Sequence, residues 1–209
     1  MKEYYCSKIE NDIIIDGNLD KPEWNPAPEV ALVDTVTGDK PKQSTSVKLM
    51  WSDDYLYAGF LCEDNYINAS LTGYNDKLYE EEVVEIFIDD NRDLKTYVEI
   101  EVNPLNALLH YYIDKNPERY FLRFARIEKT VKSAVCRNDE KGFWSVEIAV
   151  PFTELASSDH NPPVKGDRWL INLYRIDRPQ DGTVEYSAWS PTYKVNFHMP
   201  ECFGQLVFI

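Results

Sequence analysis

The sequence predicts an all-β protein: a two-sheet antiparallel β-sandwich, immunoglobulin-like or jelly-roll-like, with about ten strands. Short runs rich in Val, Ile, Phe, Tyr and Trp recur along the chain, and these residues are typical of strands. Clusters of Asp, Asn, Gly and Pro separate the runs, as expected for turns. Long segments with helical periodicity are missing, so an α/β or all-α architecture is not favoured.

The length and composition indicate a single domain spanning residues 1–209. A chain of 209 residues with 44% hydrophobic residues can form one substantial core, and many β folds of this size are one unit. Its 36 acidic and 22 basic side chains give a net charge of −14. This charge argues against nucleic acid or an anionic membrane as a partner. We therefore expect a protein whose ligand is neutral or cationic.

The sequence shows no clear targeting signal and no cysteine motif. No apolar run reaches the roughly 20 residues of a membrane span. The N-terminal residues lack a signal peptide's apolar segment, so we expect a cytoplasmic protein or one whose leader is missing from this chain. Four scattered cysteines form no CxxC pair, which disfavours a zinc site. A disulfide between Cys6 and Cys202 is a possibility if the terminal strands pair.

Strands and turns can be assigned in order from the N-terminus. We expect a short strand at Asp12–Asp16, then one helical turn at Leu19–Trp24 with Asp20 as its cap and Trp24 in the core. The pattern around Ser52-Asp53-Asp54 predicts a hairpin that joins strands Val47–Trp51 and Tyr55–Leu61.

The rest of the chain continues the pattern of short strands. Thr96–Asn103 alternates most clearly, with residues 98, 100 and 102 facing the core and residues 97, 99, 101 and 103 facing away from it. A short helical turn is expected at residues 151–155. The pair at residues 120–127 and 130–137 is expected to be adjacent. The predicted strands are Val83–Asp89, Thr96–Asn103, Ala107–Ile113, Tyr120–Ile127, Thr130–Arg137, Phe143–Val150, Trp169–Ile176 and Gln205–Phe208.

The segment Leu71–Asp89 is the leading candidate for a binding site. A polar loop carrying Tyr74 and Tyr79 leads into an apolar strand that contains one carboxylate, Glu85. Side chains alternate along a strand, so Glu85 shares its face with Val83 and Phe87. Glu85 lies either on the solvent side of a sheet or on the floor of a ligand site, since a buried carboxylate needs partners.

Two further polar patterns need an explanation. Arg175 shares a strand face with Ile171 and Leu173, so it also requires a partner. Oxygen-bearing side chains alternate at residues 89, 91 and 93, as in part of a calcium loop. The glycine and distal glutamate of such a loop are missing, and a plain hairpin turn is the favoured interpretation.

Four ordered blocks resemble the carbohydrate-binding module family 9, the β-sandwich modules often attached to xylanases. The focal motif places Asp76, Tyr79, Glu82 and Glu85 in the family's D-x-x-(aromatic)-x-x-(acid)-x-x-E pattern. The other three blocks are IDGNLDKPEW at Ile15–Trp24, VKLMWSDDYLYAGF at Val47–Phe60 and WSPTYKVNFHMPECFGQLVF at Trp189–Phe208.

The resemblance implies a site for a terminal sugar. Tyr79 and Trp189 would stack on the two sugar faces, and Glu85 would accept hydrogen bonds from hydroxyl groups. Glu101, Asn103 and Arg175 could complete a polar floor. The residues alone leave other roles open: Trp189 in the core, Tyr79 as an ordinary loop residue, and Glu101, Asn103 and Arg175 in solvent or in ion pairs. Tyr79 and Glu82 replace the family's frequent tryptophan and usual aspartate.

The resemblance implies a non-catalytic, monomeric module that recognises the ends of plant-type or other glycans and supports their breakdown. No catalytic residue and no required cofactor are expected, structural Ca²⁺ is an open possibility, and a glycan-degrading enzyme is an expected partner. The family suggests an extracellular or periplasmic location. Three alternatives remain: a glycoside hydrolase acting through two carboxylates, a sandwich that has lost sugar binding and serves protein interaction, and a haem module with Met and His ligands.

Overall fold

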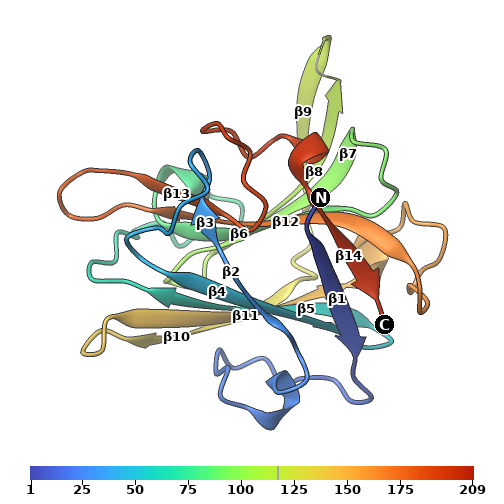
Figure 1. Cartoon of the computed structure of the whole chain (residues 1–209), viewed down its shortest axis with the longest axis horizontal. Helices are drawn as coiled ribbons and strands as arrows, with labels where there is room; N and C mark the ends of the chain where they lie inside the picture. Colours follow the sequence, from blue (N-terminus) through green and yellow to red (C-terminus); the bar gives the residue numbers. More distant parts are fainter. Residues whose placement is uncertain (117) are drawn as a thin grey trace.

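The computed structural model describes residues 1–116 and 118–209, and it confirms that the chain is all-β (Figure 1). Four short 3₁₀ helices occur in this part of the chain: η1 (Pro22–Trp24), η2 (Leu78–Glu80), η3 (Phe152–Glu154) and η4 (Pro200–Cys202). The strands are β1 (Glu3–Lys8), β2 (Glu29–Ala31), β3 (Val33–Asp34), β4 (Thr45–Trp51), β5 (Tyr55–Glu63), β6 (Val83–Asp89), β7 (Thr96–Val102), β8 (Leu108–Asn116), β9 (Tyr120–Ala125), β10 (Lys132–Asn138), β11 (Phe143–Pro151), β12 (Arg168–Asp177), β13 (Glu185–Ala188) and β14 (Gly204–Phe208).

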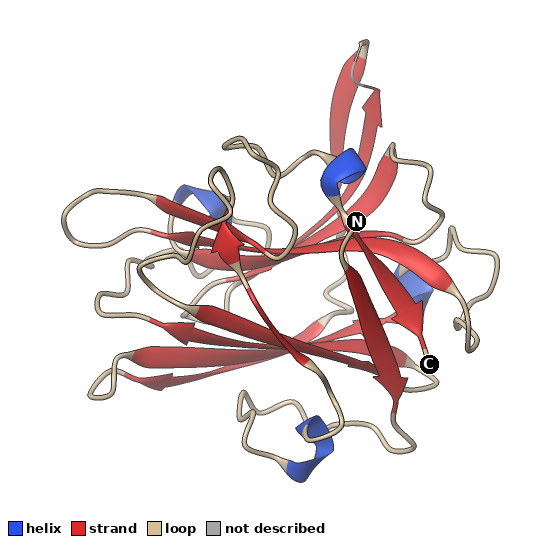
Figure 2. Ribbon diagram, in the orientation of Figure 1, coloured by secondary structure: helices blue, strands red, loops and turns tan. Residues whose placement is uncertain are grey.

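The strands form one curled sheet rather than two separate antiparallel sheets. The described residues contain 14 strands, and their main order is β10-β11-β5-β4-β1-β14-β12-β6-β7-β8-β9. The two halves of the sheet face each other, and β1 joins them at one side (Figure 2). β1 pairs in parallel with both β14 and β4, so the pairing is not purely antiparallel. The expected count of ten strands missed β1 and the short strands β2, β3 and β13, whose two to six residues carry little pattern.

The main core lies between the two halves of the sheet. Val84, Ile86 and Ile88 of β6 face Val146 and Ile148 of β11 within one cluster of buried residues. The predicted hairpin is present as β4 and β5, and residues 47, 49 and 51 lie together in this core. Burial of this apolar surface is the main contribution to the stability of the fold.

A second buried cluster covers the outer face of β6, β7 and β12. Val83 and Phe87 of β6 lie there, opposite to the core face, as strand alternation predicted. The segment 189–203 folds over them: Phe197 stacks on Tyr174 with ring centroids 4.0 Å apart, and Phe203 contacts Phe87 edge to face at 6.2 Å. The outer face of this half of the sheet is therefore largely removed from solvent.

The N-terminal region differs from the expected strand and cap. Residues 12–16 are irregular because their polar groups bind side chains instead of a neighbouring strand: Asp12 accepts hydrogen bonds from Ser52 and Tyr57, and the Asp16 amide donates to Glu147. The predicted turn is present as η1, but Lys21 rather than residue 20 lies at its N-terminus. Trp24 is fully buried, as expected.

The predicted pairing of residues 120–127 with 130–137 is wrong. β9 pairs with β8, and β10 pairs with β11, so the two strands lie at opposite ends of the sheet. β10 and β11 are joined by the short turn at residues 139–142, which closes more readily than the irregular segment between β9 and β10. The β8–β9 hairpin projects from the body of the molecule in Figure 1.

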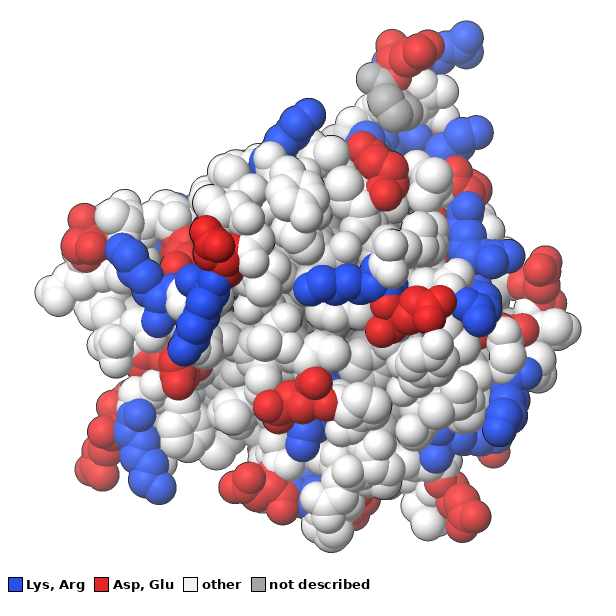
Figure 3. Space-filling model, viewed as in Figure 1, with Lys and Arg blue, Asp and Glu red and all other residues white. Residues whose placement is uncertain are grey.

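The four cysteines, all in the described part of the chain, are free thiols, so the possible Cys6–Cys202 disulfide is not formed. The described residues contain no helix of the length and hydrophobicity needed to span a membrane. Acidic and basic side chains are interspersed on the face shown in Figure 3, so the net charge does not form one patch there.

Candidate functional site

A pocket of about 260 Å³ opens on the outer face of β6 and β7, beside the β9 hairpin strand and the segment 189–203. Carboxylates form its floor, and aromatic rings, one Arg and one His surround them. The lining residues are Tyr79, Glu85, Phe87, Glu99, Glu101, Arg123, Ile176, Tyr186, Val195, Asn196, Phe197 and His198.

Strand register brings the three floor carboxylates together. Glu85 of β6 lies directly opposite Glu101 of β7, and Glu99 lies opposite Phe87. All three side chains point to the outer face because they occupy alternate positions on neighbouring strands. One oxygen from each carboxylate lies within 4.8 Å of the others.

Burial makes this carboxylate cluster reluctant to ionise. Burial, followed by repulsion from Glu99, raises the pKa of Glu85 well above its ordinary value. Burial also raises the pKa of Glu99 to about 7, although Glu101 and Arg123 act in the opposite direction. The pKa of Glu101 is raised by burial and by both neighbouring carboxylates. The pocket floor therefore favours a partner that donates hydrogen bonds or carries positive charge.

The rim of the pocket combines a cation with aromatic rings. The Arg123 guanidinium lies 5.5 Å from the ring centroid of Tyr79 and 4.8 Å from that of Phe121. Its Nη2 is 3.2 Å from His198 Nε2, and His198 Nδ1 is 2.8 Å from the Tyr97 hydroxyl. Burial lowers the pKa of His198 to about 3, so its ring is neutral at pH 7. Because Arg123 donates to Nε2, the proton of the neutral ring resides on Nδ1.

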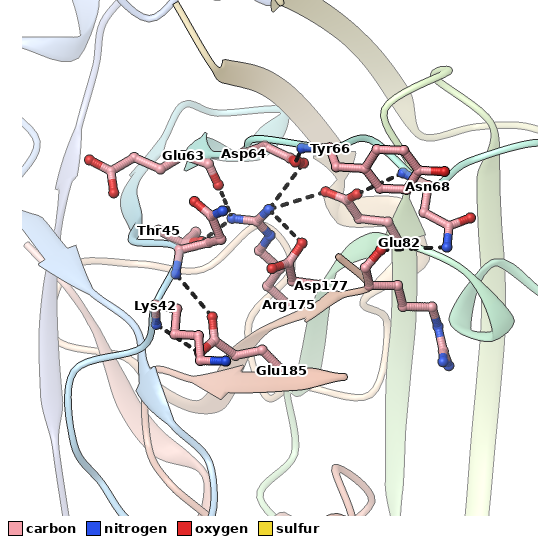
Figure 4. A network of polar contacts seen from close by, with 12 residues as sticks. Lys42, Thr45, Glu63, Asp64, Tyr66, Asn68, Glu82, Arg175, Asp177 and Glu185 are labelled. Atoms are coloured by element: carbon pink, nitrogen blue, oxygen red, sulfur yellow. Dashed lines mark hydrogen bonds and ion pairs between the residues drawn. The ribbon is translucent and has the colours of Figure 1, made fainter. Parts of the chain in front are cut away.

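A second acidic cluster lies on the core face of β12, away from the pocket. The Arg175 guanidinium binds Asp64 at 3.2 Å, Glu82 at 3.1 Å and Asp177 at 3.3 Å (Figure 4). The indole N–H of Trp144 donates to Asp64 and Glu82, both at 3.1 Å. Burial raises the pKa of Glu82 to about 8 and that of Asp177 to about 6. This buried network explains why Arg175 tolerates an apolar strand face.

Three of the six predicted site residues line the pocket: Tyr79, Glu85 and Glu101. The prediction that Arg175 joins Glu85 and Glu101 in one polar floor is wrong. Arg175 lies opposite Val84 in the β12–β6 register and faces the core, so it belongs to the buried acidic cluster instead.

Asn103 and Trp189 also lie outside the pocket. Asn103 holds the turn between β7 and β8: its Oδ1 accepts from the Leu105 and Ala107 amides, and its Nδ2 donates to the Leu71 carbonyl. Trp189 is 3% exposed and packs in the main core. A Cβ on Gly204 would lie 2.3 Å from the Trp189 ring, so the indole fills the space that this glycine leaves. Stacking on a ligand is therefore not the role that the structure gives to Trp189.

Sequence reasoning missed four residues that shape the pocket: Glu99, Arg123, Phe197 and His198. The alternation of residues 97–103 had already placed Glu99 on the face of Glu101, and that was a usable signal. Arg123 comes from β9, which reaches the pocket only through its pairing with β8. Phe197 and His198 lie in an irregular segment whose position depends on packing over Phe87.

Several side-chain oxygens of the acidic turn at residues 89–93 accept hydrogen bonds from backbone amides of the same turn, while Asp89 Oδ1 has no hydrogen-bond partner among the described residues. Asp89 accepts from the Leu94 amide, Asn91 from the Asp93 amide, and Asp93 from the amides of Lys95 and Thr96. This geometry is that of the plain turn favoured by the sequence.

Comparison with known proteins agrees with this architecture. The profile of the family described as "Carbohydrate family 9 binding domain-like" matches residues 15–209. Endo-1,4-beta-xylanase A of Thermotoga neapolitana is 31% identical over 194 residues, which are 92% of this chain and 17% of that protein. The enzyme of the same name from Thermoanaerobacterium saccharolyticum is 34% identical over 146 residues, 70% of this chain and 11% of that protein. The chain thus spans less than a fifth of the length of these relatives.

Solved structures share the fold at low sequence identity. A carbohydrate-binding module of family 9 from Caldicellulosiruptor kristjanssonii, in complex with cellotriose, superposes with a TM-score of 0.72 at 18% identity, covering 99% of this chain and 93% of the other. A Bacteroides uniformis protein gives a TM-score of 0.81 at 19% identity, covering 100% and 99%. With the family match over nearly the whole sequence, these findings show that this chain belongs to the family 9 carbohydrate-binding domains, which are non-catalytic binding modules.

Proposed function

We propose that the pocket beside β9 binds one terminal sugar ring of a plant-type oligosaccharide or polysaccharide, such as a glucan or a xylan. The observation that carries this proposal is the pairing of buried carboxylates with aromatic rings in one pocket of about 260 Å³. This volume is slightly below the roughly 300–1,000 Å³ of typical ligand sites, and it suits a single ring better than a longer segment.

The chemistry of the lining suits a sugar. The C–H faces of a pyranose are apolar and pack against aromatic rings, here Tyr79 at one wall and Phe197 with Tyr186 at another. Carboxyl groups form strong, directional hydrogen bonds with sugar hydroxyls, and Glu85 and Glu101 can accept them when ionised and also donate where burial keeps them protonated. Arg123 supplies donors for hydroxyl or ring oxygens. The binding residues proposed on this basis are Tyr79, Glu85, Glu99, Glu101 and Arg123.

The role and the ligand class are supported by the names of similar proteins. Both relatives described above are xylanases, and the C. kristjanssonii modules were solved with cellotriose and with glucose. We infer that this domain works beside a glycan-degrading enzyme and outside the cytoplasm. The substitution of Glu for the usual Asp at position 82 does not touch the pocket, since Glu82 binds Arg175 in the core. The Tyr at position 79 lines the pocket, and Trp189, the other stacking residue that the resemblance implies, does not.

Calorimetric titration with glucose, xylose, cellobiose, xylobiose and cellotriose tests this function. We expect saturable heat with micromolar to millimolar affinity, about −8 to −4 kcal/mol. Tyr79→Ala is expected to weaken binding at least tenfold, because it removes one stacking wall. The matched control is Tyr66→Ala, which changes a tyrosine that is 44% exposed and outside the pocket. Equal binding by wild type and Tyr79→Ala contradicts the proposed site, and absence of heat with every sugar favours a protein partner.

A further inference from the structure

The structure contains two clusters of three buried acids, and they differ in one respect. In the cluster of Asp64, Glu82 and Asp177, the Arg175 guanidinium forms an ion pair with each carboxylate. In the pocket cluster of Glu85, Glu99 and Glu101, four of the six carboxylate oxygens are buried without a hydrogen-bond partner among the described residues. Arg175 forms an ion pair with every carboxylate of the first cluster, whereas the described residues form no ion pair with the second cluster, and Arg123 lies only at the rim of its pocket.

Unpartnered buried carboxylate oxygens are expensive, so a partner from outside the chain is expected. Both oxygens of Glu101 are in this state, as are Glu85 Oε1 and Glu99 Oε2. These side chains are at most 2% exposed, yet all three line the pocket. Glu99 and Glu101 can bond to each other only by sharing a proton, so a small ligand that enters the pocket meets carboxylate oxygens that no other donor of the described residues occupies.

The spacing of these oxygens suits one metal ion. One oxygen from each residue lies within 4.8 Å of the other two. Oxygens bound to the same Ca²⁺ at about 2.3–2.6 Å can be at most about 4.6–5.2 Å apart, so all three can contact one ion. The donor set consists only of carboxylate oxygens, which suits hard cations rather than zinc or copper. His198 adds no ligand because both its ring nitrogens are already engaged.

The charge count favours a divalent ion. When a cation displaces the protons that burial favours, the three carboxylates carry −3 and Arg123, which lines the same pocket, carries +1, which leaves −2. A divalent cation neutralises this charge, whereas a protonated amine leaves −1. We propose that Glu85, Glu99 and Glu101 bind a hard divalent cation, Ca²⁺ in the first instance, at the floor of the pocket. Its coordination positions on the pocket side are open to water or to ligand hydroxyls.

The cation site can be tested without sugar, so the result of this experiment does not depend on the proposed function. Chelator-treated protein is titrated with CaCl₂ by calorimetry, and with Tb³⁺ while luminescence is excited through the aromatic residues near the pocket. We expect saturable 1:1 binding in both experiments. Glu101→Gln is expected to weaken Ca²⁺ binding at least tenfold, because it replaces an anionic ligand by a neutral one of the same shape.

Glu23→Gln, which changes an exposed acid on η1, is the matched control and is expected to bind Ca²⁺ like wild type. Urea unfolding of each variant confirms that it is folded. Saturable binding lost in Glu101→Gln and kept in Glu23→Gln supports the site. The proposal is overturned if wild type shows no saturable binding, or if both variants bind equally.

Glucosamine is titrated in the presence of EDTA as a separate arm. If the protonated amino sugar binds there and Ca²⁺ does not, the cluster is a site for an ammonium group and the metal proposal is wrong. Repeating the sugar titrations with CaCl₂ and with EDTA then shows whether the ion takes part in sugar binding. Failure of sugar binding with intact Ca²⁺ binding overturns the proposed function alone.

Discussion

Replacing Arg175 by Met is expected to destabilise the fold severely and to leave the sugar pocket unchanged. The Arg175 side chain is 1% exposed and forms ion pairs of 3.1–3.3 Å with Asp64, Glu82 and Asp177. Met has a similar length but no charge, so the variant leaves three buried carboxylates without their cation. Removing one partner of a buried ion pair costs about 3–5 kcal/mol. For a domain of this size, that lowers Tm by roughly 6–20 °C.

Urea unfolding followed by tryptophan fluorescence measures this loss directly. The Trp144 ring lies 6.0 Å from the guanidinium carbon of Arg175, so its emission reports on the same region. Arg175→Lys keeps the charge but not the fork of donors, and it is expected to recover part of the stability. Arg137→Met is the matched control: the Arg137–Asp139 pair at 3.0 Å is largely exposed, and such pairs contribute about 0–1 kcal/mol.

Two results refute the assignment of Arg175 to the core. The first is an unfolding free energy within about 1 kcal/mol of wild type, the size of a surface substitution effect. The second is unchanged stability with loss of sugar affinity, which places the guanidinium in the binding site as the sequence first suggested.

Three other predictions concern packing, pH and the N-terminal loop. Trp189→Ala is expected to cost about 3–5 kcal/mol in urea unfolding, because it empties a core site, and to lower Tm without a selective loss of sugar affinity at a temperature where it is folded. In the unfolded chain Glu99 loses its proton above its ordinary pKa of 4.5. In the folded protein the raised pKa of Glu99 keeps that proton bound up to about pH 7. Its stabilisation is therefore complete below pH 4.5 and disappears as the pH rises to about 7, a change of about 3 kcal/mol. Unfolding free energies measured between pH 4.5 and 8 should fall less steeply in Glu99→Gln, and parallel curves for the two proteins contradict this. Glu147→Ala is expected to cost several kcal/mol in the same assay, because Glu147 accepts from Trp24, Lys21 and two amides of the loop.

Local patterns predicted the strands well where one face is apolar. The bounds of β6 were predicted to the residue, and alternation placed Glu85 and Glu101 on the face away from the core. Both outcomes depend on the two-residue period of a strand, which is visible in the sequence. The same period placed Arg175 on an apolar face, and the demand for a buried partner was correct.

The missing information concerned which strands are neighbours. Arg175 and Glu85 were assigned to one polar floor because both are charged residues on apolar strands. The β12–β6 register places them on opposite faces, and a shift of one residue would have reversed this. Arg123 reaches the pocket through a hairpin, and Trp189 enters the core because Gly204 leaves room for an indole. These are long-range contacts that local periodicity does not encode.

The position of β1 has a consequence for how the domain is handled and fused. β1 lies between β14 and β4, so it covers one edge of each half of the sheet. Removing residues 3–8 would leave two adjacent rows of unpaired backbone amides and carbonyls, and such edges pair readily with strands of other molecules. A shortened chain would thus offer a slot that β1 of an intact copy, or an exposed strand of another molecule, could fill. Linkers and affinity tags are therefore best attached ahead of an intact β1.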